Sequence, residues 1–379
     1  MGHCGSAAKR GFLLACLLAL SPACSSGGPE GRVVRLGEDL QRALDAARQQ
    51  HGGLGATAAV FVPGAGVWTG ASGQSFEGRA VTSDMEFFLA SASKPFTATV
   101  ILQLAEEGVL SLEDSLHEWL PPFPFVDSTI TIRRLLNHTS GLFSVDDNPA
   151  FWDAMASDYS RIWDPEEVLT TFLRPPRAAP GAGWNYSNTN YMLLGLIVEK
   201  ATSSDIATQL RTRILGPLGM TRTFFFPGDS ILGEQVHRWE DVNGDGVSED
   251  LSLMYSANAH TSMMFTAGGV FSAAADLVKM SRALHEARLF PSTRLAEMLG
   301  FVPTGVVGWE YGLGMALRTD LFDGVRAYLH DGGTHGAWAR MAYLPASGVH
   351  VAVLMNTRDT PCGDAITAAL GRVALVFGR

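Results

Sequence analysis

Residues 91–107 read SASKPFTATVILQLAEE and hold the most informative pattern in the chain. Apolar residues recur at helical spacing from Pro95 to Glu107, which predicts a buried helix that begins just after Ser91. Ser91 and Lys94 are three residues apart at the start of this helix, so their side chains share a face. A serine hydroxyl needs a neighbouring base, and burial can lower the pKa of a lysine enough to make it one. We therefore predict Ser91 as a nucleophile and Lys94 as its base.

Lysine is rare in this chain, which strengthens the prediction. Of 28 Lys and Arg residues only four are lysines, at positions 9, 94, 200 and 279. Arginine does not deprotonate in proteins and therefore cannot act as a base, whereas lysine can. A lysine in place of the more usual arginine next to a serine thus favours a catalytic role. The spacing alone is weak evidence, because Ser6 and Lys9 have it too. An ordinary solvated lysine at a helix start is the alternative.

A second polar cluster, Tyr186-Ser187-Asn188, precedes a nearly apolar stretch at 191–200 that predicts a buried helix. A tyrosine between a lysine and a leaving group can relay a proton, and the amide of Asn188 can orient both the lysine and the substrate. The alternative is a loop tyrosine followed by an asparagine that caps the helix.

A third cluster, His330-Asp331-Gly332-Gly333, lies at the end of a predicted strand. Glycines after a polar side chain let a substrate lie against the strand edge, and the backbone N–H of Gly333 can complete an oxyanion hole. We therefore predict His330, Gly332 and Gly333 as substrate-binding or oxyanion residues. Taken alone, a structural histidine with satisfied hydrogen bonds explains the pattern as well.

The remaining patterns predict an α/β (α+β) protein. Residues 56–62 and 66–69 have the composition of a β-hairpin, and residues 327–330, 337–344 and 349–355 that of neighbouring strands. Residues 36–51 and 365–377 predict helices, and the middle of the chain, roughly 110–285, is mostly helical in pattern. Strands at both chain ends around a helical middle indicate one mixed sheet flanked by helices, with an inserted helical lobe.

The N-terminal residues resemble an export signal. Lys9 and Arg10 precede an apolar run at 11–20, which is too short to span a bilayer, and Ser21-Pro22-Ala23-Cys24 follows. This resembles a bacterial lipoprotein signal, so we expect residues 1–24 to be the signal and Cys24 its lipid anchor. Residues 25–36 are then a Ser/Gly-rich tether to a catalytic domain at 37–379. Plain secretion is the alternative, and either reading places the protein in the periplasm, in the cell envelope or outside the cell.

Composition limits the class of protein. A chain of 379 residues with 46% hydrophobic residues can bury a large core. A formal net charge of −10, without a cluster of Lys and Arg, argues against binding to nucleic acid. If Cys24 carries a lipid, Cys362 has no partner in the mature chain, and no disulfide framework is expected.

The three clusters, in this order and with their flanks, resemble the β-lactamase-related serine hydrolases. This group includes class C β-lactamases, D-alanyl-D-alanine carboxypeptidases, D-aminopeptidases and family VIII esterases. The resemblance extends from about residue 37 to the C-terminus. It includes LSLED at 110–114, TIRRLLNHTSGL at 131–142, WNYSNTNYMLLG at 184–195, AGGVFS at 267–272 and YGLG at 311–314.

The resemblance implies a β-lactamase/transpeptidase-like fold with an antiparallel sheet, and it implies roles for the clusters. Ser91 would form the acyl-enzyme, Lys94 would act as general base, and Tyr186 would shuttle the proton. Asn188 would position the substrate, and the N–H groups of Ser91 and Gly333 would bind the oxyanion. No cofactor is implied, and His138 would be structural.

One departure bears on the substrate. Many β-lactamases and carboxypeptidases have Lys-Thr-Gly where this chain has His330-Asp331-Gly332, and the Lys and Thr help to hold a substrate carboxylate. A neutral histidine and an acidic aspartate should hold an anion less well. We therefore expect an esterase or amide hydrolase. A D-alanyl-D-alanine carboxypeptidase or β-lactamase is the alternative within the family, and a non-catalytic cell-wall-binding lipoprotein is the alternative outside it.

One further loop resembles the start of a calcium site. Its oxygen-bearing residues stand at the first, third, fifth and ninth positions: Asp241, Asn243, Asp245 and Glu249. Ser252 takes the place of the final glutamate of that motif, which favours a polar turn over a metal site.

Overall fold

The computed structural model describes residues 28–230 and 232–377. Its main sheet has nine strands in the order β3-β2-β1-β14-β13-β12-β11-β10-β9, and every pairing is antiparallel. The strands are β1 (Gly55–Val62), β2 (Gly66–Phe76), β3 (Arg79–Ala80), β9 (Val302–Pro303), β10 (Trp309–Tyr311), β11 (Ala316–Arg318), β12 (Ala327–Thr334), β13 (Ala337–Leu344) and β14 (Val349–Met355). The antiparallel sheet implied by the family resemblance is confirmed, whereas the mixed sheet expected from the pattern alone is wrong.

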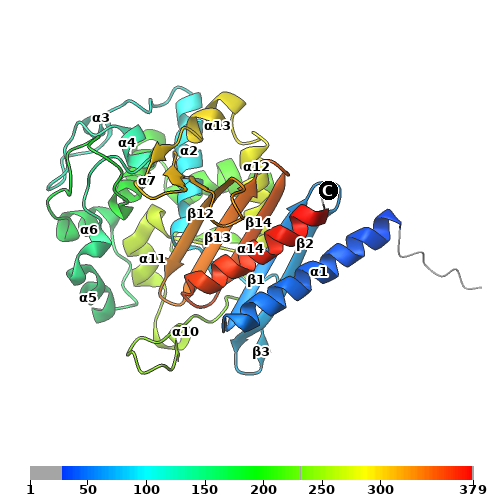
Figure 1. Ribbon diagram of the computed structural model, residues 1–379. Coiled ribbons are helices and arrows are strands. Elements are labelled where there is room, and N and C mark those ends of the chain that lie inside the picture. Colours follow the sequence, from blue (N-terminus) through cyan, green and yellow to red (C-terminus); the bar gives the residue numbers. More distant parts are fainter. Residues whose placement is uncertain (1–27, 231, 378–379) are drawn as a thin grey trace, which may run out of the picture.

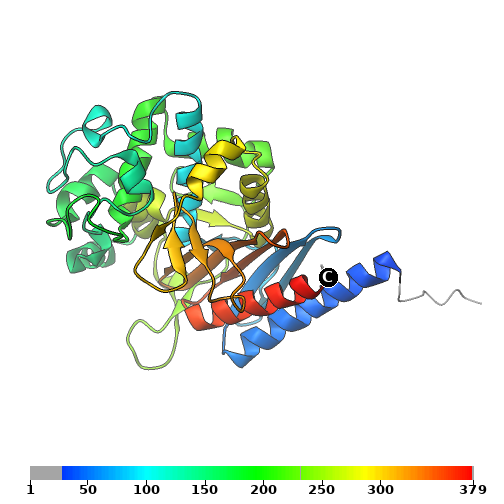
Figure 2. The ribbon, with the colours of Figure 1, turned by 45° about the horizontal axis from the view of Figure 1, so that its top comes forward.

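The two ends of the chain meet in the middle of this sheet. β1 pairs with β14 from Ala56 opposite Met355 to Phe61 opposite His350. Helices α1 (Pro29–Gln50) and α14 (Thr360–Phe377) lie side by side across one face of the sheet (Figures 1 and 2). Burial of their apolar stripes against the strands forms one of the two large cores of the protein.

Both terminal helices begin earlier than predicted. α1 begins at Pro29, so the last two thirds of the expected tether, residues 29–36, are helical. Gly28 takes the N-cap position in an extended conformation, proline is the first helical residue, and Glu30 lies in the first turn, all of which favour a helix start. α14 begins at Thr360 instead of residue 365. The expected signal and Cys24 lie outside the described residues.

The opposite face of the sheet packs against α12 (Ala274–His285), and beyond it lies the mostly helical lobe (Figure 2). The other helices are α2 (Lys94–Glu106), α3 (Leu116–Trp119), α4 (Ile132–Leu136), α5 (Pro149–Ser157), α6 (Pro165–Phe172), α7 (Asn188–Thr202), α8 (Ile206–Leu210), α9 (Gly216–Leu218), α10 (Leu251–Met254), α11 (Asn258–Met264) and α13 (Ser292–Met298). α2 is enclosed by α7 and α8, so nearly every side chain along it is buried. Within 28–230 and 232–377, no helix combines the length and apolar character needed to cross a membrane.

Short elements connect the lobe to the sheet. A three-stranded sheet has the order β4 (Phe87–Phe88), β8 (Val270–Ser272) and β5 (Thr223–Phe225), and a two-stranded one consists of β6 (Trp239–Glu240) and β7 (Glu249–Asp250). Single helical turns occur at η1 (Ala90–Ser93), η2 (Val145–Asp147), η3 (Arg211–Leu215) and η4 (Phe265–Ala267). η1 connects β4 to α2 and contacts both β12 and β13, so the start of α2 is held against the main sheet.

Candidate active site

Ser91 lies on the turn η1, directly before α2. The preceding residue, Ala90, has a φ of 47°, a left-handed conformation that costs a non-glycine residue about 1 kcal/mol. The turn is held from one side by β8: the N–H of Leu89 donates to the Val270 carbonyl at 2.9 Å, and the N–H of Val270 donates to Ser93 Oγ at 3.1 Å. Packing thus stabilises the strained turn and leaves Ser91 partly exposed.

The side chain of Lys94 is fully buried next to Ser91. Its Nζ lies 2.9 Å from Ser91 Oγ, 2.7 Å from Asn188 Oδ1 and 2.9 Å from the Ala267 carbonyl oxygen. Burial lowers the pKa of Lys94 to about 7, while the nearby carboxylate of Asp146 acts in the opposite direction. The neutral amine can therefore be populated near neutral pH, and it can then accept the Ser91 hydroxyl proton across this 2.9 Å contact.

Asn188 connects Lys94 to a carboxylate that the sequence did not reveal. Asn188 is the first residue of α7, and its backbone N–H donates to Ser144 Oγ at 2.8 Å. Its Nδ2 donates to Asp146 Oδ2 at 2.8 Å, which fixes the amide with its oxygen toward Lys94. Asp146 lies on η2, more than forty residues earlier in the chain, and no local pattern links it to Asn188.

Tyr186 is half-buried and lines the same cavity as Ser91, whose hydroxyl is close enough to act on the pKa of the Tyr186 phenol. Burial raises the pKa of Tyr186 well above its ordinary value, so the hydroxyl keeps its proton and can donate it. The ammonium nitrogen of Lys94 lies 4.9 Å from the centre of the Tyr186 ring. The structure therefore brings together three residues predicted from the sequence: Ser91, Lys94 and Tyr186.

His138 holds this tyrosine in place. Its ring lies 4.3 Å from the Tyr186 ring, and its Nδ1 accepts hydrogen bonds from the N–H of Ser187 at 3.2 Å and from Asn190 Nδ2 at 3.0 Å. Burial lowers the pKa of His138 well below its ordinary value, so the ring is neutral. His138 thus positions the loop that carries Tyr186, which agrees with the structural role implied by the family resemblance.

Gly332 of β12 packs directly onto the nucleophile turn. A Cβ at this position would lie 1.9 Å from the Leu89 carbonyl oxygen and 2.9 Å from the Ser91 nitrogen, so no side chain fits. β11 pairs with β12 only at Ala327–Leu329, whereas β13 pairs with it as far as Thr334. From His330 onward, β12 therefore has one edge without a neighbouring strand. The oxyanion role of the Ser91 and Gly333 N–H groups stays a prediction.

His330 and Asp331 do not present free charges to the cavity. Nε2 of His330 bonds the Tyr311 hydroxyl at 2.8 Å, and burial lowers the pKa of His330 to about 4, so the ring is neutral as expected. Asp331 forms a bidentate ion pair with Arg340, whose side chain is 1% exposed and also contacts Asp364. The expectation that Asp331 weakens anion binding stays a prediction, because its carboxylate is paired with an arginine that it shares with Asp364.

These residues surround a cavity of about 310 Å³. Ser91 and Tyr186 lie on its wall with His330 and the two glycines of β12. Aromatic side chains form much of the rest, and two arginines complete it: Trp184, Trp309, Tyr311, Trp338, Arg318 and Arg358. Arg318 pairs with Asp320, while Arg358 is exposed. The cavity can accommodate a small apolar group next to a nucleophilic serine.

The candidate calcium loop is a turn stabilised by its own residues. The Asp241 carboxylate accepts hydrogen bonds from the N–H groups of residues 244, 245 and 246. Glu249 accepts from the Val242 N–H at 3.0 Å and from Asn243 Nδ2 at 2.6 Å. In the described part of the chain, no three His, Cys, Asp or Glu residues are grouped as a metal site. The geometry favours the polar turn that the sequence analysis preferred.

Comparison with known proteins decides the family. The family model described as Beta-lactamase matches residues 40–375, which is most of the chain. The chain belongs to the Beta-lactamase family. The resemblance inferred from the sequence is confirmed, and so is the β-lactamase/transpeptidase-like fold.

Relatives of this Beta-lactamase family member include penicillin-binding protein 4* of Bacillus subtilis (strain 168). It is 30% identical over 323 residues, which cover 80% of this chain and 67% of the relative. Esterase EstB of Burkholderia gladioli is 32% identical over 201 residues, about half of either chain. A crystal structure of a D-stereospecific amidohydrolase from Streptomyces sp. superimposes with a TM-score of 0.76 at 31% identity, over 88% of this chain and 98% of that one. The protein described here, as a member of this family, is a serine hydrolase, as predicted.

Proposed function

We propose that this protein hydrolyses esters or amides through an acyl-enzyme on Ser91. The observation that carries the proposal is the contact of 2.9 Å between Ser91 Oγ and the buried Nζ of Lys94, whose pKa is lowered to about 7. Nucleophilic catalysis by a serine requires a base within hydrogen-bonding distance, and the pKa of that base should be near the working pH. Lys94 meets both requirements.

Acylation begins when Lys94 takes the Ser91 hydroxyl proton while Oγ attacks the carbonyl carbon of the substrate. The N–H groups of Ser91 and Gly333 stabilise the resulting oxyanion. The bond to the leaving group then breaks, Tyr186 gives its proton to the leaving oxygen or nitrogen, and the Lys94 ammonium returns a proton to Tyr186. In deacylation, water attacks the acyl-enzyme, its proton passes to the same relay, and Ser91 leaves with a proton.

The chemistry of β12 favours esters or amides that need no carboxylate at the His330-Asp331-Gly332 position. His330 is neutral and engaged with Tyr311, and Arg340 is occupied by two carboxylates, so neither supplies a free cation there. Similarity to an esterase and to a D-stereospecific amidohydrolase supports both substrate types. Hydrolysis of D-peptides is the second candidate, supported by the same amidohydrolase, and β-lactam hydrolysis is the third.

A covalent probe tests the nucleophile. We expect a fluorophosphonate to label the full chain, and we expect Ser91→Ala to abolish labelling while the protein stays folded. Fluorescent penicillin in a parallel reaction separates the candidates, because labelling by it favours cell-wall peptidase or β-lactamase chemistry over an esterase. Lys94→Arg should lose labelling nearly as completely, since arginine keeps the charge but cannot accept the proton. Wild-type labelling of Lys94→Arg would refute the proposed base.

We also propose that the protein is exported and anchored by a lipid on Cys24, on the basis of residues 1–24. Cells that produce the full chain, grown with a labelled fatty acid, should give a labelled membrane-associated protein. Cys24→Ser should remove the label. An unlabelled protein in the culture medium would instead support plain secretion.

A further inference from the structure

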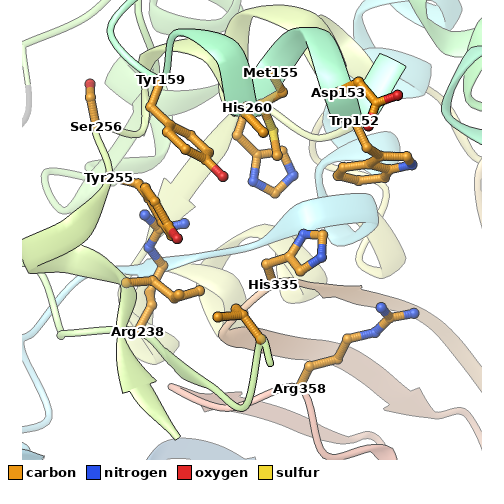
Figure 3. A pocket seen from close by; sticks show the side chains of 13 residues that line it. Trp152, Asp153, Met155, Tyr159, Arg238, Tyr255, Ser256, His260, His335 and Arg358 are labelled. Atoms are coloured by element: carbon orange, nitrogen blue, oxygen red, sulfur yellow. The ribbon is translucent and has the colours of Figure 1, made fainter. Parts of the chain in front are cut away.

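A second and larger cavity, of about 580 Å³, lies beyond the end of β12 (Figure 3). Its walls include Trp152 of α5 and His260 of α11 on one side and His335, which follows β12, on the other. Tyr159 and Tyr255 add aromatic surface, their rings 3.9 Å apart. The cavity is therefore wide enough for a substrate group and largely aromatic.

This cavity adjoins the active site. Arg358 lines both cavities, and Gly333 in the first is two residues from His335 in the second. His260 packs edge-on against Phe88, three residues before Ser91, with ring centres 5.1 Å apart. Trp152 Nε1 donates to the backbone carbonyl of Asp146 at 2.7 Å, in the turn that also fixes Asn188. A substrate bound at Ser91 can thus extend into the second cavity.

Arg238 is the unusual residue of this cavity. Arg238 is only 8% exposed, and its side chain extends from the lower wall of the cavity toward Tyr255 (Figure 3). Among the residues that the structure describes, its guanidinium has no ion pair and no hydrogen bond. Asp250 is the acid whose charge acts on it, but the Asp250 oxygens are engaged with His237 Nδ1 at 2.7 Å and with the Ser252 N–H at 3.0 Å. A buried cation without a partner is costly, and an anionic ligand would compensate that cost.

The two histidines of the cavity do not compete with Arg238 for an anionic ligand. Burial lowers the pKa of His260 well below its ordinary value, so that ring is neutral, and burial also lowers the pKa of His335, which favours its neutral form. His260 Nε2 is engaged with Thr334 Oγ1 at 2.8 Å. Asp153 is the acid on the wall, and it lies on the exposed rim. The enclosed part of the cavity therefore has positive charge and aromatic surface.

Tyr186 decides which part of the substrate reaches this cavity. Its hydroxyl contacts Ser91 from the first cavity, so the leaving group that it protonates departs on that side. The acyl group stays on Ser91, and the side toward Thr334 and His335 leads to the second cavity. We propose that the acyl group occupies the second cavity and that Arg238 pairs with a carboxylate on it, which makes monoesters or monoamides of dicarboxylic acids the preferred substrates. This inference rests on the proposed hydrolysis at Ser91.

The test compares p-nitrophenyl monoesters of a dicarboxylic acid series, from succinyl to suberyl, with matched esters whose far end is a neutral carboxamide. In the wild type, kcat/KM should favour the carboxylate at the chain length that reaches Arg238, by about tenfold or more, as expected for a charge-assisted pair. Arg238→Met should reduce this ratio to about one, and Arg238→Lys should retain part of it. Arg326→Met, an exposed arginine at the other end of β12, serves as the control and should keep the wild-type ratio.

A binding measurement separates failure of this inference from failure of the proposed function. The free dicarboxylates should raise the Tm of Ser91→Ala by binding the folded state, and the added Arg238→Met change should abolish the rise. If the dicarboxylates bind to Ser91→Ala but the wild type hydrolyses none of the esters, the anion site at Arg238 is supported and the proposed hydrolysis is refuted. Turnover with equal kcat/KM for both ester series, or a ratio unchanged by Arg238→Met, would refute the role of Arg238.

Discussion

Asp146→Asn tests the electrostatic control of the proposed base. Hydrogen bonds of 2.7 Å from Lys94 Nζ to Asn188 Oδ1 and of 2.8 Å from Asn188 Nδ2 to Asp146 Oδ2 link the two charges in series. With the amide between them, the charges are about 7 Å apart, which gives about 2 kcal/mol at an effective dielectric constant of about 20. Asparagine keeps an oxygen acceptor for Asn188 but removes the charge, so the change acts mainly on electrostatics.

The sign follows from the protonation states. The Asp146 carboxylate stabilises the Lys94 ammonium and so raises the pKa of Lys94, against the larger effect of burial. Only the neutral amine is a base, so kcat/KM of the wild type should fall about tenfold per pH unit below about pH 7. Without the carboxylate the pKa of Lys94 falls, and the acidic limb should move to lower pH by roughly one unit, since about 1.4 kcal/mol corresponds to one unit.

The assay is the pH profile of kcat/KM for a chromogenic ester. Asp147→Asn is the matched control, because Asp147 pairs with Arg177 at the surface and has no contact with Asn188. His330 and His138 cannot account for the limb, since burial lowers the pKa of His330 to about 4 and that of His138 well below its ordinary value. An unmoved limb, a move to higher pH, or an equal move in Asp147→Asn would refute the assignment of Lys94 as the titrating base.

Gly332→Ala should lower both activity and Tm, because a Cβ there would lie 1.9 Å from a backbone oxygen of the nucleophile turn. Gly333→Ala meets its nearest atom at 3.7 Å and should melt close to the wild type, so equal Tm values for the two variants would contradict the packing argument. Asp331→Asn should cost about 2 kcal/mol in the free energy of unfolding, measured in urea, because it removes one of the two partners of the buried Arg340. Added calcium should leave Tm unchanged, since the oxygens of loop 241–249 are used within the loop; a rise of several degrees would restore the calcium interpretation.

The sequence predicted best the residues whose relationships are local. Ser91 and Lys94 share a helix start, and Asn188 stands two residues after Tyr186, so spacing and family resemblance were enough to single them out. The sequence did not single out Asp146 and Arg238, because their importance comes from tertiary packing. Asp146 accepts a hydrogen bond from Asn188, which lies on another helix. Arg238 is unusual because it is buried and its guanidinium has no ion pair among the described residues.

The Asp331–Arg340 pair lies between these two cases. The strands on either side of His335-Gly336 form a hairpin whose register places Asp331 directly opposite Arg340. The apolar pattern that predicts the first strand ends at residue 330, one residue before Asp331, so the pattern alone does not place Asp331 opposite Arg340. The strand in fact continues through the glycines to Thr334, and this continuation brings the opposite charges together across the hairpin.

The seam between β1 and β14 also bears on how the chain folds. The first long strand of the sheet, β1, pairs with a strand that is synthesised about 300 residues later, since Ala56 lies opposite Met355. Such high contact order slows folding, since a very long loop must close before the pairing is gained. A ribosome-bound nascent chain therefore exposes an unpaired edge of β1 until β14 emerges. Deletion of that strand alone should leave a chain that aggregates instead of a smaller folded enzyme.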